Sequence, residues 1–213
     1  MKIGIIGAGN VGTAIGKLLT AKGHRVFVSF AKTPDEIAKA AAAIGGTAQS
    51  GSVADAVAFG DVVVLATPYA ATPAALKQAG DAKTRRIVWD CTNALKPDYS
   101  GLAVGFNTSA GEEVQKLAPW ARVVKAIPPS AELMRSARRL LGGNKVTVFL
   151  CSDDAEAKKT VESLVREIDA DPIDAGPLQS ARYAEPAGYM IVKLYMMGMG
   201  GRIGIGLLRE TSK

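Results

Sequence analysis

Short apolar runs alternate along the chain with stretches whose apolar positions recur at helical spacing. The runs predict strands at 2–6, 25–30, 61–66, 86–90 and 122–127, and further strands at 145–150 and 172–175. The run at 61–66 is apolar throughout its interior, as expected of a strand that is covered on both faces. Strands that alternate with helices predict a Rossmann-type, doubly wound, mainly parallel α/β sheet, followed by a small α/β extension.

Capping signals place the helices between these strands. Thr33 precedes Pro34 and Glu36 in the order typical of a helix start, and Ser109 stands three residues before Glu112 in the same way. Ser52 is suited to cap a short helix. Helices are therefore expected at 13–22, from 34 onward, at 53–59, 70–79 and 110–118, around 161–168, and in the C-terminal part.

A glycine-rich turn links the first strand to the first helix. It consists of Gly7, Ala8, Gly9, Asn10, Val11 and Gly12, which is the dinucleotide-binding pattern GxGxxG in its required position. Gly7 permits the tight turn, Gly9 lets a pyrophosphate approach the backbone, and Gly12 lets the helix pack closely on the sheet. The helix N-terminus then faces the phosphates.

The end of the second strand indicates which dinucleotide binds. Sites for NAD usually place an acidic residue there, where this chain has Ser29, Phe30 and Lys32. A hydroxyl and an ammonium suit the 2′-phosphate of NADP, whereas a carboxylate would repel it. Asp35 and Glu36 fall in the first turn of a helix, where acids stabilise the helix dipole in any case. We therefore expect NADP(H).

The remaining site residues are expected at the carboxyl ends of the strands, where such sheets bind ligands. These ends carry Thr67-Pro68-Tyr69, Thr92-Asn93 and Ala126-Ile127-Pro128. The expected cofactor-binding residues are Gly7, Ala8, Gly9, Asn10, Val11, Gly12, Ser29, Phe30, Lys32, Thr67, Pro68, Tyr69, Asn93 and Ala126.

Groups for proton transfer are scarce near these strand ends. His24 is the only histidine, and it precedes the second strand at the opposite edge of the sheet, where we expect a surface residue. The candidate proton donors are Tyr69, Lys125, Tyr183 and Lys193. A reaction that only moves a hydride between two cofactors needs alignment and little else, so no catalytic side chain is assigned.

Composition narrows the class further. The chain has 213 residues, of which 48% are hydrophobic, and its net charge of +6 is spread along the sequence. These values fit a globular protein with an anionic small-molecule ligand and without nucleic acid. Cys91 and Cys151 lack metal-ligand spacing, so we expect no metal and two buried thiols in the cytoplasm. We see no signal peptide, and Lys193 and Arg202 interrupt the apolar stretch 189–208, which we expect to be a buried helix or an interface rather than a membrane span.

Several motifs together resemble the NADPH-dependent reductases of the deazaflavin coenzyme F-420, over nearly the whole chain. They are the glycine turn, the turn from Ser29 to Lys32, Thr67-Pro68-Tyr69, Ala126-Ile127-Pro128, and a cluster of Glu167, Ile168, Asp169, Asp174, Ala175, Gly176, Pro177, Leu178, Arg182 and Glu185. The last cluster is the most specific, because generic Rossmann proteins lack it.

The resemblance implies a Rossmann domain at 1–127 and an extension at 128–213 that completes the acceptor pocket and forms a homodimer interface. It also implies direct hydride transfer from the nicotinamide to F-420 or a flavin, with alignment by Ala126, Ile127 and Pro128. The chain departs from the family pattern where Phe30 replaces a frequent arginine, Tyr69 a tryptophan and Lys125 a histidine. These departures leave the identity of the electron acceptor open.

Two other functions stay open. One is an NADPH sensor without turnover, whose methionine-rich C-terminal part contacts a protein partner, and the other is a reductase of a small carbonyl or imine. Pyrroline-5-carboxylate reductase has a similar start, but it needs a longer helical dimerisation domain than the residues after 150 supply. The hydroxyacid dehydrogenases fit poorly, because Lys193 is followed one helical turn later by Met197 instead of asparagine.

Overall fold

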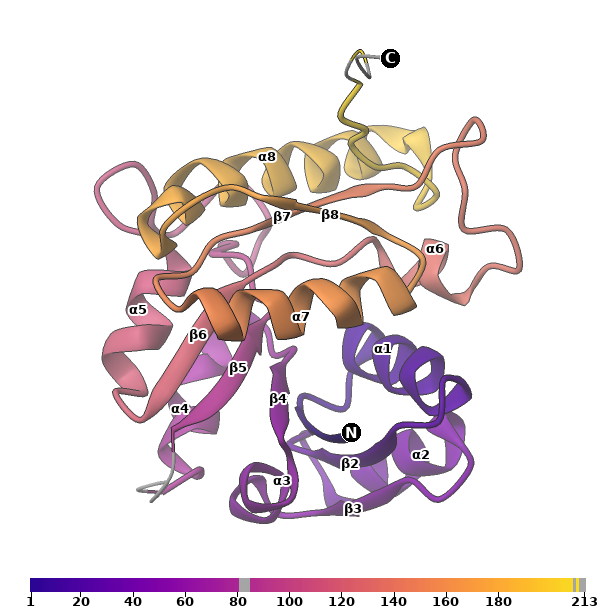
Figure 1. Ribbon diagram of the computed structural model, residues 1–213, viewed down its shortest axis with the longest axis vertical. Coiled ribbons are helices and arrows are strands. Elements are labelled where there is room, and N and C mark those ends of the chain that lie inside the picture. Colours follow the sequence, from indigo (N-terminus) through magenta and orange to yellow (C-terminus); the bar gives the residue numbers. More distant parts are fainter. Residues whose placement is uncertain (81–84, 209, 211–213) are drawn as a thin grey trace.

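The computed structural model describes residues 1–80, 85–208 and 210 (Figure 1). Its main sheet contains six parallel strands in the order β3-β2-β1-β4-β5-β6. The strands are β1 (Lys2–Ile6), β2 (Arg25–Ser29), β3 (Gln49–Gly51), β4 (Val62–Leu65), β5 (Arg86–Asp90) and β6 (Ala121–Lys125). This is the strand order of dinucleotide-binding α/β proteins, so the predicted fold class is confirmed.

Helices cover both faces of this sheet (Figure 1). They are α1 (Asn10–Ala21), α2 (Pro34–Ile44), α3 (Val53–Phe59), α4 (Thr72–Lys77) with the short η1 (Tyr69–Ala71), and α5 (Ala110–Leu117). In β4, Val62 and Val64 pack in one core and Val63 and Leu65 in the other. The run is apolar throughout because successive side chains point to opposite, covered faces of the sheet.

The caps predicted from the sequence form at the helix starts. The hydroxyls of Thr33 and Ser109 accept hydrogen bonds from the backbone amides of Glu36 and Glu112, and Ser52 forms a reciprocal capping box with Asp55. Strand β3 was not predicted from the sequence. This edge strand has only three residues, Gln-Ser-Gly, so it produces no apolar run.

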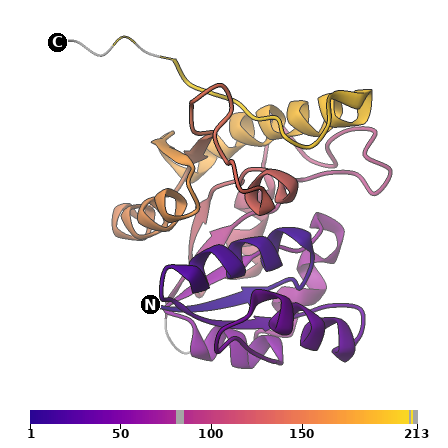
Figure 2. The same cartoon turned by 90° about the vertical axis from the view of Figure 1, so that its right-hand side faces the viewer.

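The C-terminal extension lies across the carboxyl ends of β4, β5 and β6 (Figures 1 and 2). It contains α6 (Ala131–Arg135), β7 (Thr147–Leu150), α7 (Ala155–Glu167), β8 (Asp171–Asp174), η2 (Leu178–Ser180), α8 (Ala181–Leu194) and η3 (Tyr195–Met199). Strands β7 and β8 form a separate two-stranded parallel sheet. An antiparallel bridge between Lys125 and Cys151 joins the two sheets.

The segment after α8 differs from its prediction. Residues 201–208 run without helical structure along β7, where the carbonyl of Ile205 accepts a hydrogen bond from the Thr147 amide at 2.7 Å. Met196, Met197 and Leu208 are exposed, so a buried helix is wrong for this stretch, while the alternative expectation, an interface, stays a prediction. No helix among the described residues has the length and apolarity needed to cross a membrane. Cys91 and Cys151 are free and buried, as expected.

Candidate functional site: the glycine turn and its cavity

The glycine turn has the shape that a dinucleotide requires. Gly7 has a φ of +122°, and a Cβ atom there would lie 2.5 Å from the Ala66 carbonyl oxygen. A Cβ atom on Gly12 would lie 2.0 Å from the Gly7 carbonyl oxygen, so the helix packs directly on the turn. A Cβ atom on Gly9 would meet no atom within 4 Å. The open space therefore lies over Gly9, where the backbone is free to receive a pyrophosphate.

A cavity of about 660 Å³ extends from this turn along the strand ends to α8. It is lined by residues that follow β4, β5 and β6 and by residues of α8, β7 and the C-terminal segment. Of the predicted site residues, it brings together Gly9, Asn10, Val11, Thr67, Pro68, Tyr69, Asn93, Ile127 and Pro128. The volume lies within the range of small-molecule and cofactor sites.

Two predicted contacts need correction. Ser29 is fully buried, and its hydroxyl donates a hydrogen bond to the Ile5 carbonyl at 2.9 Å, so this hydroxyl is not free to hold a phosphate. Ala126 is also fully buried, and its carbonyl accepts a hydrogen bond from Trp89 Nε1 at 2.8 Å. Local sequence pattern places both residues at strand ends but does not show which way their polar groups point.

The remaining predicted residues do not line this cavity. Lys32 is exposed and lines neither this cavity nor the groove described next, and its backbone amide donates to the Glu36 carboxylate at 3.0 Å. Phe30 is half-buried with a φ of +62°. Gly7 and Gly12 are buried in the turn itself, while Ala8 lines the groove beside it.

A second groove, of about 830 Å³, lies on the other side of the glycine turn. Gly9 and Asn10 line both hollows, so the two hollows meet at the turn. The groove runs between α1, α2 and α6, and its charged lining consists of Lys17, Lys39, Arg135 and Arg139 with Glu36. The excess of cations makes it attractive to phosphate groups.

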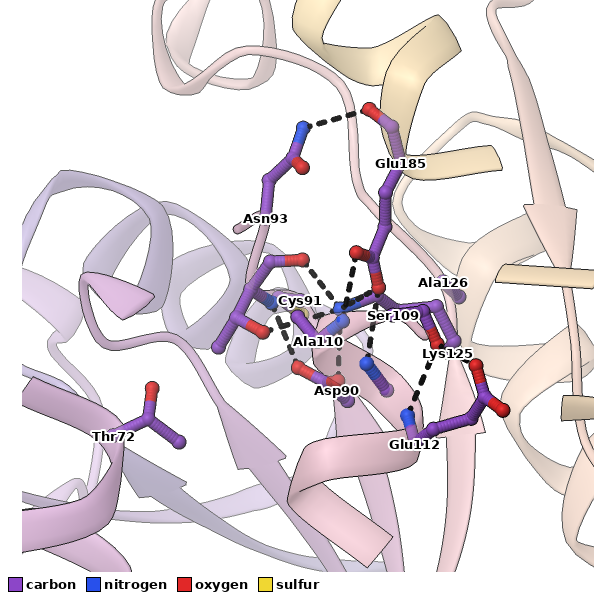
Figure 3. A network of polar contacts seen from close by, with 12 residues as sticks. Thr72, Asp90, Cys91, Asn93, Ser109, Ala110, Glu112, Lys125, Ala126 and Glu185 are labelled. Atoms are coloured by element: carbon purple, nitrogen blue, oxygen red, sulfur yellow. Dashed lines mark hydrogen bonds and ion pairs between the residues drawn. The ribbon is translucent and has the colours of Figure 1, made fainter. Parts of the chain in front are cut away.

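Behind the main cavity, three charged residues form a buried network (Figure 3). Lys125 Nζ lies 2.8 Å from Asp90 Oδ2 and 3.2 Å from Glu185 Oε1, and all three side chains have at most 1% exposure. The same ammonium donates to the Thr92 carbonyl at 2.6 Å. Burial alone lowers the pKa of Lys125, but the facing carboxylates of Asp90 and Glu185 outweigh it and raise the pKa.

Glu185 connects this network to two other elements. Its carboxylate accepts hydrogen bonds from the backbone amides of Ala110 at 2.8 Å and Gly111 at 3.0 Å, in the first turn of α5. Its carbonyl accepts one from Asn93 Nδ2 at 3.1 Å (Figure 3). The network thus holds α8, which lines the cavity, against the ends of β5 and β6. Sequence reasoning missed Asp90, although opposite charges at the last positions of neighbouring strands were an available signal.

Of the four candidate proton donors, only Tyr69 lines the main cavity. Tyr69 lines the cavity, and burial with the nearby carboxylates of Glu113 and Glu185 raises its pKa. Lys125 is sealed in the network, while Tyr183 and Lys193 are exposed and do not line the cavity. His24 pairs with Glu167 at 2.5 Å and is half-buried, so the expected surface position is wrong. No histidine or carboxylate occurs among the described residues that line the main cavity.

This fold and site define a Rossmann-type dinucleotide-binding protein. Residues 2–94 match the family model described as NADP oxidoreductase, coenzyme F420-dependent. The match agrees with the resemblance drawn from the sequence motifs, and the described family is one of NADP-dependent oxidoreductases.

Two curated proteins extend the likeness beyond residue 94. The F420-dependent NADP reductase of Methanocaldococcus jannaschii is 28% identical over 210 residues, covering 91% of this chain and 92% of that protein. Metalloreductase STEAP3 of Rattus norvegicus is 28% identical over 185 residues, covering 86% of this chain. The chain spans only 36% of the length of the rat protein.

Solved structures agree with the fold. A protein of Arthrobacter sp. FB24, described as a candidate F420-dependent NADP-reductase, is 28% identical with a TM-score of 0.86, and the match covers 98% of this chain and 100% of that one. A reductive aminase of Aspergillus terreus in complex with NADPH is 17% identical with a TM-score of 0.65, and the match covers 93% of this chain and 62% of that one. At this identity the aminase supports the fold alone.

Proposed function

We propose that the protein transfers a hydride between NADP(H), bound at the glycine turn, and a planar deazaflavin or flavin acceptor, bound in the same cavity. The observation that carries the proposal is the continuity of the cavity from Gly9 to α8, with a mostly apolar lining in which the described residues include no histidine and no carboxylate. Hydride transfer between two ring systems needs close parallel placement and exclusion of water, and it needs little proton transfer.

The chain's own residues have distinct tasks in this proposal. The amides at Gly9, Asn10 and Val11 bind the pyrophosphate at the N-terminus of α1. Ile127 and Pro128 form the apolar surface beside the reacting rings. Ala126 is fully buried and supports these two residues without lining the cavity. When bound, NADP(H) supplies or accepts the hydride. The buried network of Asp90, Lys125 and Glu185 keeps the α8 wall at a fixed distance from these residues.

The test is anaerobic oxidation of NADPH with F-420, FMN, FAD and a set of small ketones and imines as acceptors. The proposal expects turnover with F-420 or a flavin, and a rate that changes little between pH 6 and 8. Turnover confined to a ketone or imine would contradict it, as would NADPH binding without turnover of any acceptor. The last result would instead support a sensor that presents its C-terminal part to a protein partner.

One observation favours a second candidate, the reduction of a small carbonyl or imine. Tyr69 lines the cavity, and its raised pKa keeps the phenol protonated at neutral pH, as a proton donor must be. In that case Tyr69→Phe would reduce turnover by roughly 10²-fold or more. With a deazaflavin or flavin acceptor the same substitution is expected to change turnover by no more than a few-fold.

NADP preference is proposed to rest on Lys32. From the sequence, Ser29 and Lys32 are both expected to hold the adenosine 2′-phosphate. Because Ser29 is buried, we assign this contact to the exposed ammonium of Lys32. A charge-assisted hydrogen bond contributes about 1.5–3 kcal/mol, so Lys32→Ala should weaken NADPH binding roughly 10- to 100-fold and leave NADH binding almost unchanged. Equal loss for both cofactors, or loss for neither, would contradict this role.

The proposal also includes an organisation of the chain. Residues 1–127 are proposed as the NADP-binding domain, and residues 128–213 as an extension that completes the acceptor pocket. A homodimer is proposed because α8 and η3 expose Tyr183, Met190, Tyr195, Met196, Met197 and Met199. Light scattering after size exclusion tests the dimer, and a monomer at micromolar concentration would contradict it. Two free, buried thiols fit a cytoplasmic location.

A further inference from the structure

Helix α6 of the C-terminal extension lies against α1, beside the glycine turn (Figure 2). A serine cap and two buried side chains hold it in place. Ser130 caps the helix by accepting a hydrogen bond from the Leu133 amide at 3.1 Å, and Leu133 and Met134 are buried with 1% and 2% exposure. The last residue of the helix, Arg135, is exposed and follows directly after these anchored residues.

Arg135 reaches the start of α1. Its Nη1 atom donates a hydrogen bond to Asn10 Oδ1 at 3.1 Å, although the two residues are 125 positions apart in the sequence. Asn10 is the first residue of α1 and follows Gly9, above which the space is open. Arg135, Gly9 and Asn10 all line the cationic groove beside the turn.

The charges around this point favour an anion. The N-cap of α1 is Gly9, which has no side chain to accept hydrogen bonds from the helix amides, and the first turn contains no acidic residue. Among the groove residues, Lys17 and Lys39 add positive charge, while the Glu36 carboxylate accepts from the Lys32 amide at 3.0 Å. Arg139 is already paired with Asp169 at 2.7 Å. Arg135 thus brings a planar, positively charged donor to a helix start whose first turn contains no acidic residue.

We propose that Arg135 is a cofactor-binding residue that contacts the pyrophosphate of the dinucleotide, with Asn10 positioning its guanidinium. This inference rests on the proposed function only in requiring that a dinucleotide binds at the glycine turn. It gives the C-terminal extension a part in cofactor binding that lies outside the family-matched residues 2–94. The pyrophosphate is chosen over the 2′-phosphate because Asn10 stands at the helix N-terminus, where the pyrophosphate lies in this fold.

The test measures dissociation constants of NADPH and NADH by fluorescence titration for the full chain. Arg135→Ala should weaken both cofactors by a similar factor, roughly 10- to 100-fold, and Arg135→Lys should retain part of the affinity. The matched control is Arg138→Ala, an exposed arginine three residues further on that lines neither hollow, and it should change either constant less than about 2-fold. Loss for NADPH alone would overturn the pyrophosphate assignment in favour of the 2′-phosphate, and unchanged constants would overturn the inference altogether.

Thermal unfolding separates cofactor binding from a structural link between α6 and α1. If Arg135 binds the cofactor, Arg135→Ala leaves the midpoint of the free protein unchanged and reduces the increase in midpoint that NADPH causes. A lower midpoint without cofactor, together with unchanged dissociation constants, would show a structural link and overturn the inference. Both readouts report binding, so failure to find an electron acceptor would contradict the proposed function and leave this inference intact.

Discussion

Glu185 of α8 and Lys125 at the end of β6 form an ion pair, 3.2 Å between Oε1 and Nζ, in which neither side chain is more than 1% exposed. The pair connects the C-terminal extension to the main sheet directly behind the cavity. Because Asp90 contacts the same ammonium, one positive charge serves two buried carboxylates. The amides of Ala110 and Gly111 supply the remaining compensation for Glu185.

Loss of the central ammonium should therefore be costly. Lys125→Met keeps the apolar stem but leaves Asp90 and Glu185 buried without their counter-ion, and we expect a loss of about 3–5 kcal/mol in the free energy of unfolding. Urea unfolding followed by circular dichroism measures it. The control is Lys116→Met, which removes an exposed pair with Glu113 and should leave the free energy of unfolding almost unchanged. Equal costs for the two variants would contradict the role of the network.

Stability towards acid should depend on Glu112. Arg182 donates two hydrogen bonds to its carboxylate, at 2.7 and 2.9 Å, and these lower the pKa of Glu112 in the folded protein. The resulting stabilisation is complete above the ordinary glutamate pKa of about 4.3 and is lost as the pH falls through the lower pKa of the folded state.

The free energy of unfolding of the wild type should therefore fall more steeply below about pH 4.3 than that of Glu112→Gln. Measurements of urea unfolding from pH 6 to 3 compare the two slopes. Glu156→Gln, which alters an exposed pair with Lys159, is the control and should keep the wild-type slope. Parallel curves for wild type and Glu112→Gln would show that the Arg182 contact contributes nothing in solution.

Gly9 and Gly12 of the turn should respond differently to substitution. Gly9→Val places its side chain in open space, so we expect a folded protein with unchanged circular dichroism and no measurable NADPH binding. Gly12→Val forces a Cβ to within 2.0 Å of the Gly7 carbonyl oxygen, so it should also destabilise the fold by about 1–3 kcal/mol or more. Wild-type NADPH affinity in Gly9→Val would refute the placement of the cofactor.

Both thiols should be unreactive in the folded protein. Burial raises the pKa of Cys91 well above its ordinary value and that of Cys151 to about 11. At pH 8 the thiolate is then scarce, and labelling by Ellman's reagent should be more than about 100-fold slower than for a free thiol of pKa near 8.5. Two thiols per chain should react once the protein is unfolded in urea. Fast labelling of one thiol without denaturant would indicate that Cys91, which lines the cavity, is open to solvent.

The amino-acid sequence by itself determined the architecture and the location of the cofactor turn. The signals that determined them are local, because backbone sterics and side-chain alternation act over a few residues. They are the apolar runs, the serine caps of α3 and α5, and the glycines at 7, 9 and 12. β3 escaped because its edge position needs no apolar side chains. Local sequence does not show whether a polar group is free to bind a ligand. The hydroxyl of Ser29, for example, is buried and donates to the Ile5 carbonyl.

Only the tertiary structure decided how distant segments meet around the cavity. The ammonium of Lys125 satisfies carboxylates 35 and 60 residues away in the chain, and the Arg135 contact with Asn10 spans 125 residues. No periodicity marks such pairs, because they form where strand ends, α6 and α8 converge. The physical reason is that burial and long-range electrostatics depend on how the whole chain packs. Packing makes Lys125, a candidate proton donor, a buried counter-ion. It also brings the exposed Arg135 to the cofactor turn.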